Sequence, residues 1–307
     1  MTEVSVALIN ELNNLQAAYL IVSACTKLPY VECSEVTAND QIFMFAKQED
    51  ADTFCEAKKE RGIPVNVQTL KLLPIANDPN NRMVSQIRHV LSSLPALHID
   101  VVNFKGAEME QSQEVPVSGL VPASIYQKVV RSNMYNPLLN LTGIFFCQAV
   151  RVPKESQDVQ ELQIAEEEFS ANLVKSELLL AMLPPEGQQV TPGVPQQIQL
   201  SECRFPFAKN QKGESFLPLF TDITELHKFA AGRNMGIIKV KYTQLNNYLH
   251  KDTRGFLLNP SSFALPLIRE GLAPMAARFG REMEIPASAQ QAEQQVEVQS
   301  EQQTEEV

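Results

Sequence analysis

The spacing of hydrophobic residues predicts a mixed series of helices and strands in the first third of the chain. Apolar residues at three- and four-residue intervals predict a helix over 4–15, and short apolar runs predict strands at 18–24 and 42–45. The series continues with a helix over 49–61 that Gly62 ends, a strand at 63–67, a helix over 83–94 and a strand at 97–104. Helices and strands therefore mix without strict alternation, which favours helices packed on a sheet.

A second series of similar order occupies the later part of the chain. It begins with a helix over 163–175 and a strand at 178–183, which a Pro- and Gly-rich loop over 184–195 follows. It continues with strands at 198–205 and 216–220 joined by a turn at 209–213, a helix ending near Gly232, a strand after Gly236, a helix over 244–250 and a strand at 255–258. The two series predict an α+β fold with two related domains, each a mixed or antiparallel sheet with packed helices.

The two series also share an internal sequence repeat. Residues 41–54 align with 216–229, 62–67 with 236–241, and 99–104 with 255–260. Two copies of about 100 residues predict duplicated domains rather than a solenoid. The predicted division is a first copy over 1–106, a linker with some packed structure over 107–160, a second copy over 161–286 and a tail over 287–307.

The two segments outside the copies differ in character. Within the linker, the pattern predicts a helix at 125–130 and a buried strand at 143–150. The tail is rich in Gln and Glu and contains no basic or aromatic residue, which predicts disorder. A solubilising tail and a docking peptide are its two alternatives.

Charge and cysteine content narrow the classes of partner and compartment. The net charge of −10 disfavours nucleic acid and anionic membranes as partners. The N-terminus has no positive region, and no apolar run reaches eighteen residues, so we expect neither a signal peptide nor a membrane span. The five cysteines are odd in number and scattered, as is typical of a reducing compartment. These features predict a cytoplasmic protein.

Motifs for catalysis and cofactor binding are missing from the sequence. There is no Gly-rich phosphate loop and no GxSxG nucleophile elbow, and the four histidines are far apart. Cys25 and Cys33 are eight positions apart, which does not fit a Cys-x-x-Cys motif. We therefore expect no catalytic residue, no metal site, no cofactor and no enzymatic activity. An enzyme of unrecognised type stays an alternative, because residues distant in sequence can converge in space.

Polar residues follow two predicted strands of the second copy. Thr221 and Asp222 follow the strand at 216–220, and Asn259 and Pro260 follow the strand at 255–258. Backbone amides exposed where a helix begins can bind a ligand, whereas a helix cap and a simple turn are the structural alternatives. Both pairs follow strands, so we expect them at one edge of the sheet. The candidate binding residues are Phe216, Phe220, Thr221, Asp222, Asn259 and Pro260.

The second copy resembles a domain of the SseB family, named for enhanced serine sensitivity. The resemblance rests on Phe-Leu-Pro-Leu-Phe-Thr-Asp at 216–222, a helix ending in Phe229, and Phe-Leu-Leu-Asn-Pro at 256–260, and it covers residues 163–272. The first copy departs from these marks, with Phe43, Ala46 and Phe104 where Pro218, Thr221 and Pro260 stand, and is interpreted as a diverged copy. The resemblance implies an α+β fold and a cytoplasmic bacterial protein, and it implies no reaction.

The leading functional prediction is a non-enzymatic, regulatory protein that makes protein–protein contacts through its second copy. The alternative is a small-molecule sensor tied to amino-acid metabolism, as the family's name hints, with its ligand in a cleft between the copies. A homo-oligomeric scaffold is compatible with each of these.

Overall fold

The computed structural model describes residues 3–75, 78, 82–132, 134–185, 203–210 and 212–280. Several sequence predictions fall outside this range: residues 186–195 of the Pro- and Gly-rich loop, 198–202 of one strand, residue 211 of the predicted turn, and the tail over 287–307.

The first sheet is mixed. It consists of β1 (Ala17–Ser23), β2 (Val31–Cys33), β3 (Asp40–Phe45), β4 (Val65–Pro74), β5 (Met83–Ser85), β6 (Val101–Lys105) and β7 (Gln113–Pro116). The strands follow the order β5-β4-β1-β3-β6-β7, with β2 paired to β3. β3 and β6 run parallel, and the other neighbouring pairs are antiparallel.

Among the described residues, the second sheet has the same arrangement without a counterpart of β5. It consists of β8 (Glu177–Met182), β9 (Ala208–Lys209), β10 (Ser215–Phe220), β11 (Gly236–Lys241), β12 (Gly255–Leu258) and β13 (Leu265–Ile268), in the order β11-β8-β10-β12-β13 with β9 paired to β10. β10 and β12 run parallel, and the other pairs are antiparallel. The expected α+β fold with two mixed sheets is confirmed. Duplication of one unit stays a prediction, which the shared strand order supports.

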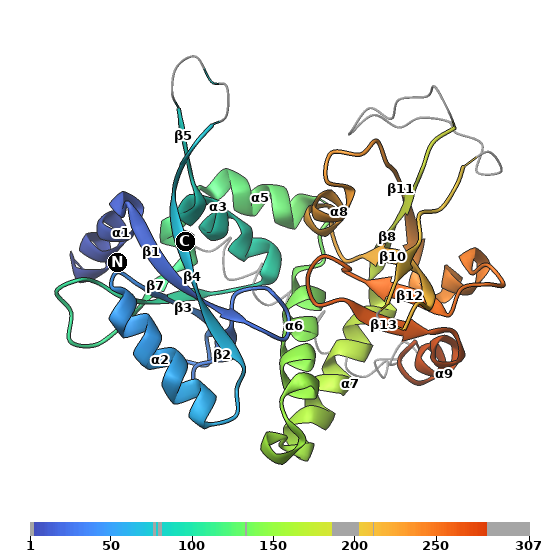
Figure 1. Ribbon diagram of the computed structural model, residues 1–307, viewed down its shortest axis with the longest axis horizontal. Coiled ribbons are helices and arrows are strands. Elements are labelled where there is room, and N and C mark those ends of the chain that lie inside the picture. Colours follow the sequence, from blue (N-terminus) through green and yellow to red (C-terminus); the bar gives the residue numbers. More distant parts are fainter. Residues whose placement is uncertain are drawn as a thin grey trace, which may run out of the picture.

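Helices lie on both faces of each sheet (Figure 1). The first unit, residues 3–120, contains α1 (Glu3–Asn14), α2 (Gln48–Glu60), α3 (Gln86–Ser93), η1 (Leu94–Leu97) and α4 (Val117–Leu120). The second unit, residues 159–280, contains α7 (Val159–Lys175), α8 (Ile223–Ala230), η4 (Tyr242–Tyr248) and α9 (Arg269–Phe279). Between them come α5 (Ala123–Arg131), α6 (Pro137–Arg151) and η2 (Lys154–Ser156).

Alternation along the strands decides which helix covers which face. In β3, Phe43 and Phe45 pack with Ala51 and Cys55 of α2, while Ile42 and Met44 join a core on the opposite face. This follows from the two-residue period of a strand, whose successive side chains point to opposite faces. In the second unit α8 has the position of α2, since Leu226 and Ala230 pack with Phe220.

One hydrophobic core joins the two units through α6. Leu139 and Ile144 of α6 belong to the same buried cluster as Phe104 of β6 and Phe256 of β12. The predicted linker therefore contains an element that packs against both sheets, and its helix at 125–130 is confirmed by α5.

The strand predicted at 143–150 is wrong, because these residues form part of α6. A short apolar run does not distinguish a strand from a buried helix. This helix shows no simple apolar stripe because it is enclosed by both units. Gly143 fits that setting, since a Cβ there would lie 3.2 Å from the Phe263 ring and 3.4 Å from the Phe169 ring.

Two other predicted helices differ from the structure. The segment 83–94 begins as the strand β5, and α3 starts only after Ser85, whose hydroxyl accepts the Arg88 N–H at 3.2 Å. This side chain is an N-cap, which marks where the helix begins. Residues 244–248 of the helix predicted at 244–250 belong to a 3₁₀-helix, η4.

Strand pairing also corrects the sequence alignment of the two units. Gln41 of β3 pairs with Val101, whereas its aligned partner Phe216 of β10 pairs with Gly255. Val101 and Gly255 are therefore equivalent, which shifts the repeat at 99–104 by two residues. By this register Lys105, rather than Asn103, occupies the place of Asn259.

Candidate functional site

The structure brings together the polar residues that follow β10 and β12, as expected. The Asn259 side-chain amide donates to Thr221 Oγ1 at 2.8 Å, and its oxygen accepts the Thr221 N–H at 3.0 Å. The Thr221 hydroxyl donates in turn to Asp222 Oδ2 at 3.2 Å. We call Thr221, Asp222 and Asn259 the corner; all three are buried.

The corner is tied to both units. Asp222 Oδ1 caps α8 by accepting the N–H groups of Thr224 at 2.7 Å and Glu225 at 3.0 Å. Asn140 of α6 donates to Asp222 Oδ2 at 2.7 Å and to the Ala96 carbonyl of the first unit at 2.8 Å. Helix capping by Asp222, one of the two sequence interpretations, is therefore confirmed.

The remaining predicted residues are also largely enclosed. Phe216 and Phe220 are buried, and Phe220 packs against Phe229 of α8 with ring centroids 5.4 Å apart. Pro260 is half-buried. Asn259 has a φ of 47°, in the left-handed region that Asn tolerates better than most residues. Ligand or partner binding at these residues stays a prediction, and the contacts observed there are internal to the protein.

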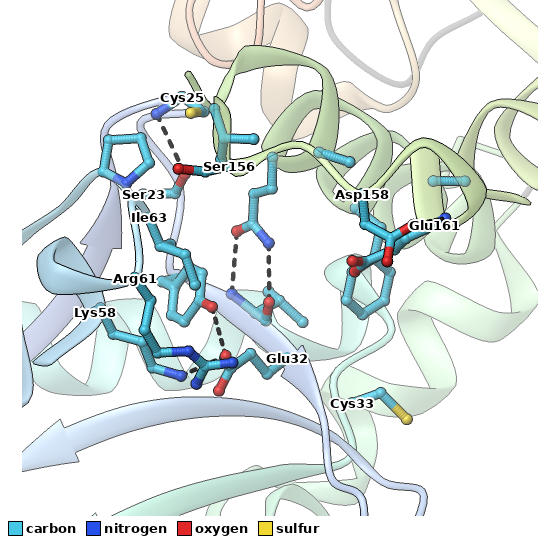
Figure 2. Close-up of a pocket in the computed structure, with 18 of the residues that line it drawn as sticks. Ser23, Cys25, Glu32, Cys33, Lys58, Arg61, Ile63, Ser156, Asp158 and Glu161 are labelled. Carbon is cyan, nitrogen blue, oxygen red and sulfur yellow. Dashed lines mark hydrogen bonds and ion pairs between the residues drawn. The ribbon is translucent and has the colours of Figure 1, made fainter. Parts of the chain in front are cut away.

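A second candidate site is the cleft between the two units (Figure 2). It has a volume of about 850 Å³ and is lined by β2 and α2 of the first unit and by α6 and α7. A cleft of this size lies within the range typical of small-molecule sites.

The floor of the cleft is fixed by hydrogen bonds. The Gln148 side chain of α6 donates to the Val31 carbonyl at 2.9 Å and accepts the Val31 N–H at 3.2 Å. Beside it, the Tyr30 hydroxyl donates to Glu32 Oε1 at 2.6 Å, and the same oxygen pairs with the ammonium group of Lys58. Burial, with the neighbouring Glu32 carboxylate, raises the pKa of Tyr30, so its hydroxyl stays protonated.

Lys58 is buried although it carries a charge. Its ammonium lies 5.1 Å from the centroid of the Phe54 ring, 5.5 Å from that of Tyr30 and 5.7 Å from that of Phe43. Ring faces and the Glu32 carboxylate together compensate for lost hydration. These contacts therefore hold the Lys58 side chain at the floor of the cleft.

The walls of the cleft meet at a close contact between the first unit and η2. A Cβ on Gly62 would lie 2.0 Å from the hydroxyl oxygen of Ser156, and Gly62 has a φ of 77°. Only glycine combines that approach and that backbone conformation without strain. Arg61 precedes this contact on one wall, and Asp158 follows it on the other.

Two cysteines line the cleft, and both are free thiols. Burial raises the pKa of Cys25 and of Cys33, so neither has the lowered pKa typical of a reactive cysteine. Among the described residues, no three His, Cys, Asp or Glu side chains come close enough to hold a metal ion. Within the same part of the chain, no helix has the length and apolarity needed to cross a membrane.

A third feature is a projecting ribbon of β4 and β5, seen at the top of Figure 1. We call residues 71–75 and 82–85 the arm. Leu73 opposes Val84, Pro74 opposes Met83, and the Ile75 N–H continues the ladder to the Arg82 carbonyl at 3.0 Å. Four large apolar side chains are exposed on it: Leu73 (44%), Ile75 (38%), Met83 (51%) and Val84 (47%).

The arm was not predicted from the sequence, because the strand was expected to end at residue 67. Apolar residues continue at Leu70, Leu72, Leu73 and Ile75, and a second short apolar pair, Met83 and Val84, follows the turn-forming sequence at 76–81. Two apolar runs separated by Asn, Asp and Pro residues are typical of a hairpin. The sequence therefore contained the pattern of a hairpin at this position.

Comparisons with known proteins give one family and two distant structures. The structural matches are Tic22 from Plasmodium falciparum (9% identity, 90% of this chain and 99% of that chain, TM-score 0.20) and Anabaena Tic22, described as protein transport (10% identity, 83% and 93%, TM-score 0.20). No curated protein matches the sequence. Residues 157–274 match the family model of the SseB protein N-terminal domain, which supports the SseB resemblance of the second unit.

Proposed function

We propose that this is a non-enzymatic cytoplasmic protein that acts through protein–protein contacts in a regulatory role, and that the arm is its contact surface. The observation that carries this proposal is the gathering of four exposed apolar side chains on one projecting ribbon. Single exposed apolar residues are normal on soluble proteins, whereas clusters of them mark interaction sites.

The geometry of the arm suits insertion into a partner. Leu73 and Val84 are directly opposed and share one face, while Met83 lies on the other face opposite Pro74. Both faces are therefore apolar. β5 is also an edge strand, whose outer backbone groups are available for pairing with a partner strand.

Charges around the arm indicate the chemistry of the partner. Lys71, Arg82 and Arg88 are exposed on or beside it, and Arg82 forms an ion pair with Asp78 at 2.8 Å. An apolar groove with an acidic rim would complement this surface. The buried corner has a different role in the proposal: it fixes the second unit to α6 and the first unit.

Two further observations support the proposal of a non-enzymatic, cytoplasmic protein. Three of the six site residues predicted from the sequence, Thr221, Asp222 and Asn259, engage each other in hydrogen bonds, as a structural network does. Cys25, Cys33, Cys55 and Cys147 are free thiols, which fits a reducing compartment.

The proposal is tested with the double variant Leu73→Thr/Val84→Thr, which keeps β-branched or β-compatible residues in the ribbon. The matched control is Val159→Thr, because Val159 is 77% exposed on another element, α7. Tagged full-length chains are used to capture partners from native lysate, and sedimentation velocity of the purified chain reports self-association. We expect at least a tenfold weaker complex for the arm variant, since losing an apolar anchor costs about 1–2 kcal/mol.

The melting temperatures of both variants should stay near that of the wild type, because the substituted side chains are exposed. Retention of the same partners by the arm variant at wild-type strength would refute the arm as the contact surface. Loss of partners with the Val159→Thr control to the same degree would show that general surface changes, rather than the arm, are responsible.

A further inference from the structure

The two walls of the cleft carry opposite charges that lack ion-pair partners. On the first unit, Arg61 follows α2, is exposed, and pairs with no carboxylate of the described residues. On the second unit, Asp158 and Glu161 stand at the start of α7, and neither forms an ion pair within that same set. Figure 2 shows Arg61 on one side of the floor and Asp158 and Glu161 on the other.

These charges border the same cleft. Arg61, Glu161 and Tyr30 all line it, with Arg61 and Glu161 on opposite walls (Figure 2). Burial is the main cause of the raised pKa of Tyr30, and the Glu32 carboxylate adds to it.

The floor also offers an unused acceptor. Tyr30 and Lys58 both donate to Oε1 of Glu32, and Oε2 accepts no hydrogen bond from any described residue. The Glu32 side chain keeps 28% of its surface exposed and lines the cleft. A main-chain N–H of a ligand would satisfy this oxygen.

We propose that the cleft binds a short peptide with free ends, with its carboxylate at Arg61 and its ammonium at Glu161 and Asp158. This site is separate from the arm, so it goes beyond the proposed function. Arg61 offers a fork of donors that matches a carboxylate, and the carboxylates of α7 match an ammonium group. The part of the peptide between its two charged ends lies over the apolar side chains of Phe145, Val152 and Ile164, which also line the cleft.

Size and charge select a peptide over simpler ligands. A volume of about 850 Å³ would leave a free amino acid mostly surrounded by water, whereas ligands that bind well fill most of their site. Five carboxylates and two cationic groups line the cleft, which disfavours an anionic ligand. Arg61, in turn, disfavours a purely cationic diamine.

Binding is measured by isothermal titration calorimetry of the full chain with the tripeptide Ala-Leu-Ala. The comparison ligands are its N-acetylated form, its C-terminal amide, free alanine and 1,4-diaminobutane. We expect binding of the free tripeptide, at least tenfold weaker binding of each capped form, and weak or no binding of alanine and the diamine. A thermal shift should accompany binding, because a ligand of the native state stabilises it.

The variants Arg61→Gln and Glu161→Gln assign the two ends. Arg61→Gln should weaken the free tripeptide about tenfold and leave the C-terminal amide unaffected, since both changes remove the same interaction. Glu161→Gln should behave in the same way toward the N-acetylated peptide. The control Arg131→Gln removes an exposed charge outside the cleft and should change neither affinity.

Several results would overturn the inference. The cleft is not a peptide site if the tripeptide fails to bind at millimolar concentration, or if it binds equally well to both cleft variants. Binding of alanine as tight as that of the tripeptide would overturn the size argument. Tighter binding of the diamine would make the cleft a site for cations alone.

Discussion

The two units place different chemistry at equivalent positions of their two sheets. After β10 and β12, Thr221, Asp222 and Asn259 form a buried network of hydrogen bonds. At the ends of β3 and β6, which we call the corner of the first unit, Ala46 stands in the place of Thr221 and Lys105 in that of Asn259. Lys105 forms an ion pair with Asp50 at 2.7 Å. The side chains of this pair keep about a quarter of their surface exposed, at 23% and 25%.

The difference follows from what covers each corner. Asn140 of α6 encloses the corner of the second unit, where an unpaired polar group would be costly, so every side chain finds a partner. The first unit's corner stays in contact with water, where an ion pair adds little and a network is not required. The shared strand order therefore ends in a buried corner in the second unit. In the first unit it ends in a solvent-exposed corner, and this unit also carries the arm and one wall of the cleft.

The largest expected difference comes from removing the central side chain of each corner. Asn259→Ala should lower the free energy of unfolding by about 3 kcal/mol, because it leaves buried partners unsatisfied and places alanine at positive φ. Lys105→Ala should cost less than about 1 kcal/mol. Urea denaturation measures both, and equal losses would contradict the contrast between a closed and an open corner.

A smaller contrast lies along α6, where two amide side chains bind the first unit. Asn140→Ala should cost about 2 kcal/mol, because the buried Ala96 carbonyl and Asp222 each lose a donor. Gln148→Ala should cost about half as much, since the Val31 groups border the cleft and regain water. Calorimetric or urea unfolding that ranks Gln148 above Asn140 would show that the cleft floor, rather than the corner, holds the units together.

The glycines that follow α2 and α8 make a matched pair. Gly62 and Gly232 both have positive φ, but only Gly62 faces a close neighbour, Ser156. Gly232→Ala should cost about 1 kcal/mol from backbone strain, and Gly62→Ala should cost about 1 kcal/mol more.

Adding Ser156→Gly to Gly62→Ala isolates the contact between the cleft walls. Ser156→Gly should restore the unfolding free energy that Gly62→Ala loses through the clash with Ser156. The loss from backbone strain should remain, so that the double variant resembles Gly232→Ala in unfolding free energy. No recovery would mean that the walls do not touch at this point in solution.

The smallest expected effect is a pH dependence of stability that comes from Asp40, the first residue of β3. Burial, together with the nearby Asp100, raises the pKa of Asp40 above its ordinary value of 3.8. Folding therefore favours the protonated form, and the charged form reduces stability once the pH rises through the folded-state pKa. Asp40→Asn should stabilise the protein slightly at pH 7, by a few tenths of a kcal/mol after allowance for solvent screening.

This advantage should vanish as the pH falls below about 3.8, where wild-type Asp40 is protonated in both the folded and unfolded states. Thermal unfolding at a series of pH values measures the difference. A constant advantage over the whole range would show that charge is not its cause.

Much of the fold, and part of the site, was predictable from local patterns. Alternation and helix caps identified most strands and the start of α8, because these signals act over a few residues. The meeting of Thr221 with Asn259 was also foreseen, because both follow neighbouring strands. The position of α6 was not, since its buried surroundings depend on two sheets that are distant in sequence.

The charged residues of the cleft were harder to predict from the sequence, for the same reason. Arg61, Glu32 and Glu161 are separated by up to 129 positions in the sequence and line one cleft because α6 packs against β2 and α7 packs against α6. No local pattern marks them. The burial of the corner was equally invisible, since Asn140, which encloses it, lies in a segment predicted as linker.

The central claim is that partners contact the arm while the corner holds the fold, and one side-by-side experiment tests it. Partner capture and urea unfolding are measured for Leu73→Thr/Val84→Thr and for Asn259→Ala, under conditions in which both chains are folded. We predict that the arm variant loses its partners at near wild-type stability, and that the corner variant loses stability and keeps its partners. The opposite pattern, with partners lost at the corner and retained at the arm, would contradict the account.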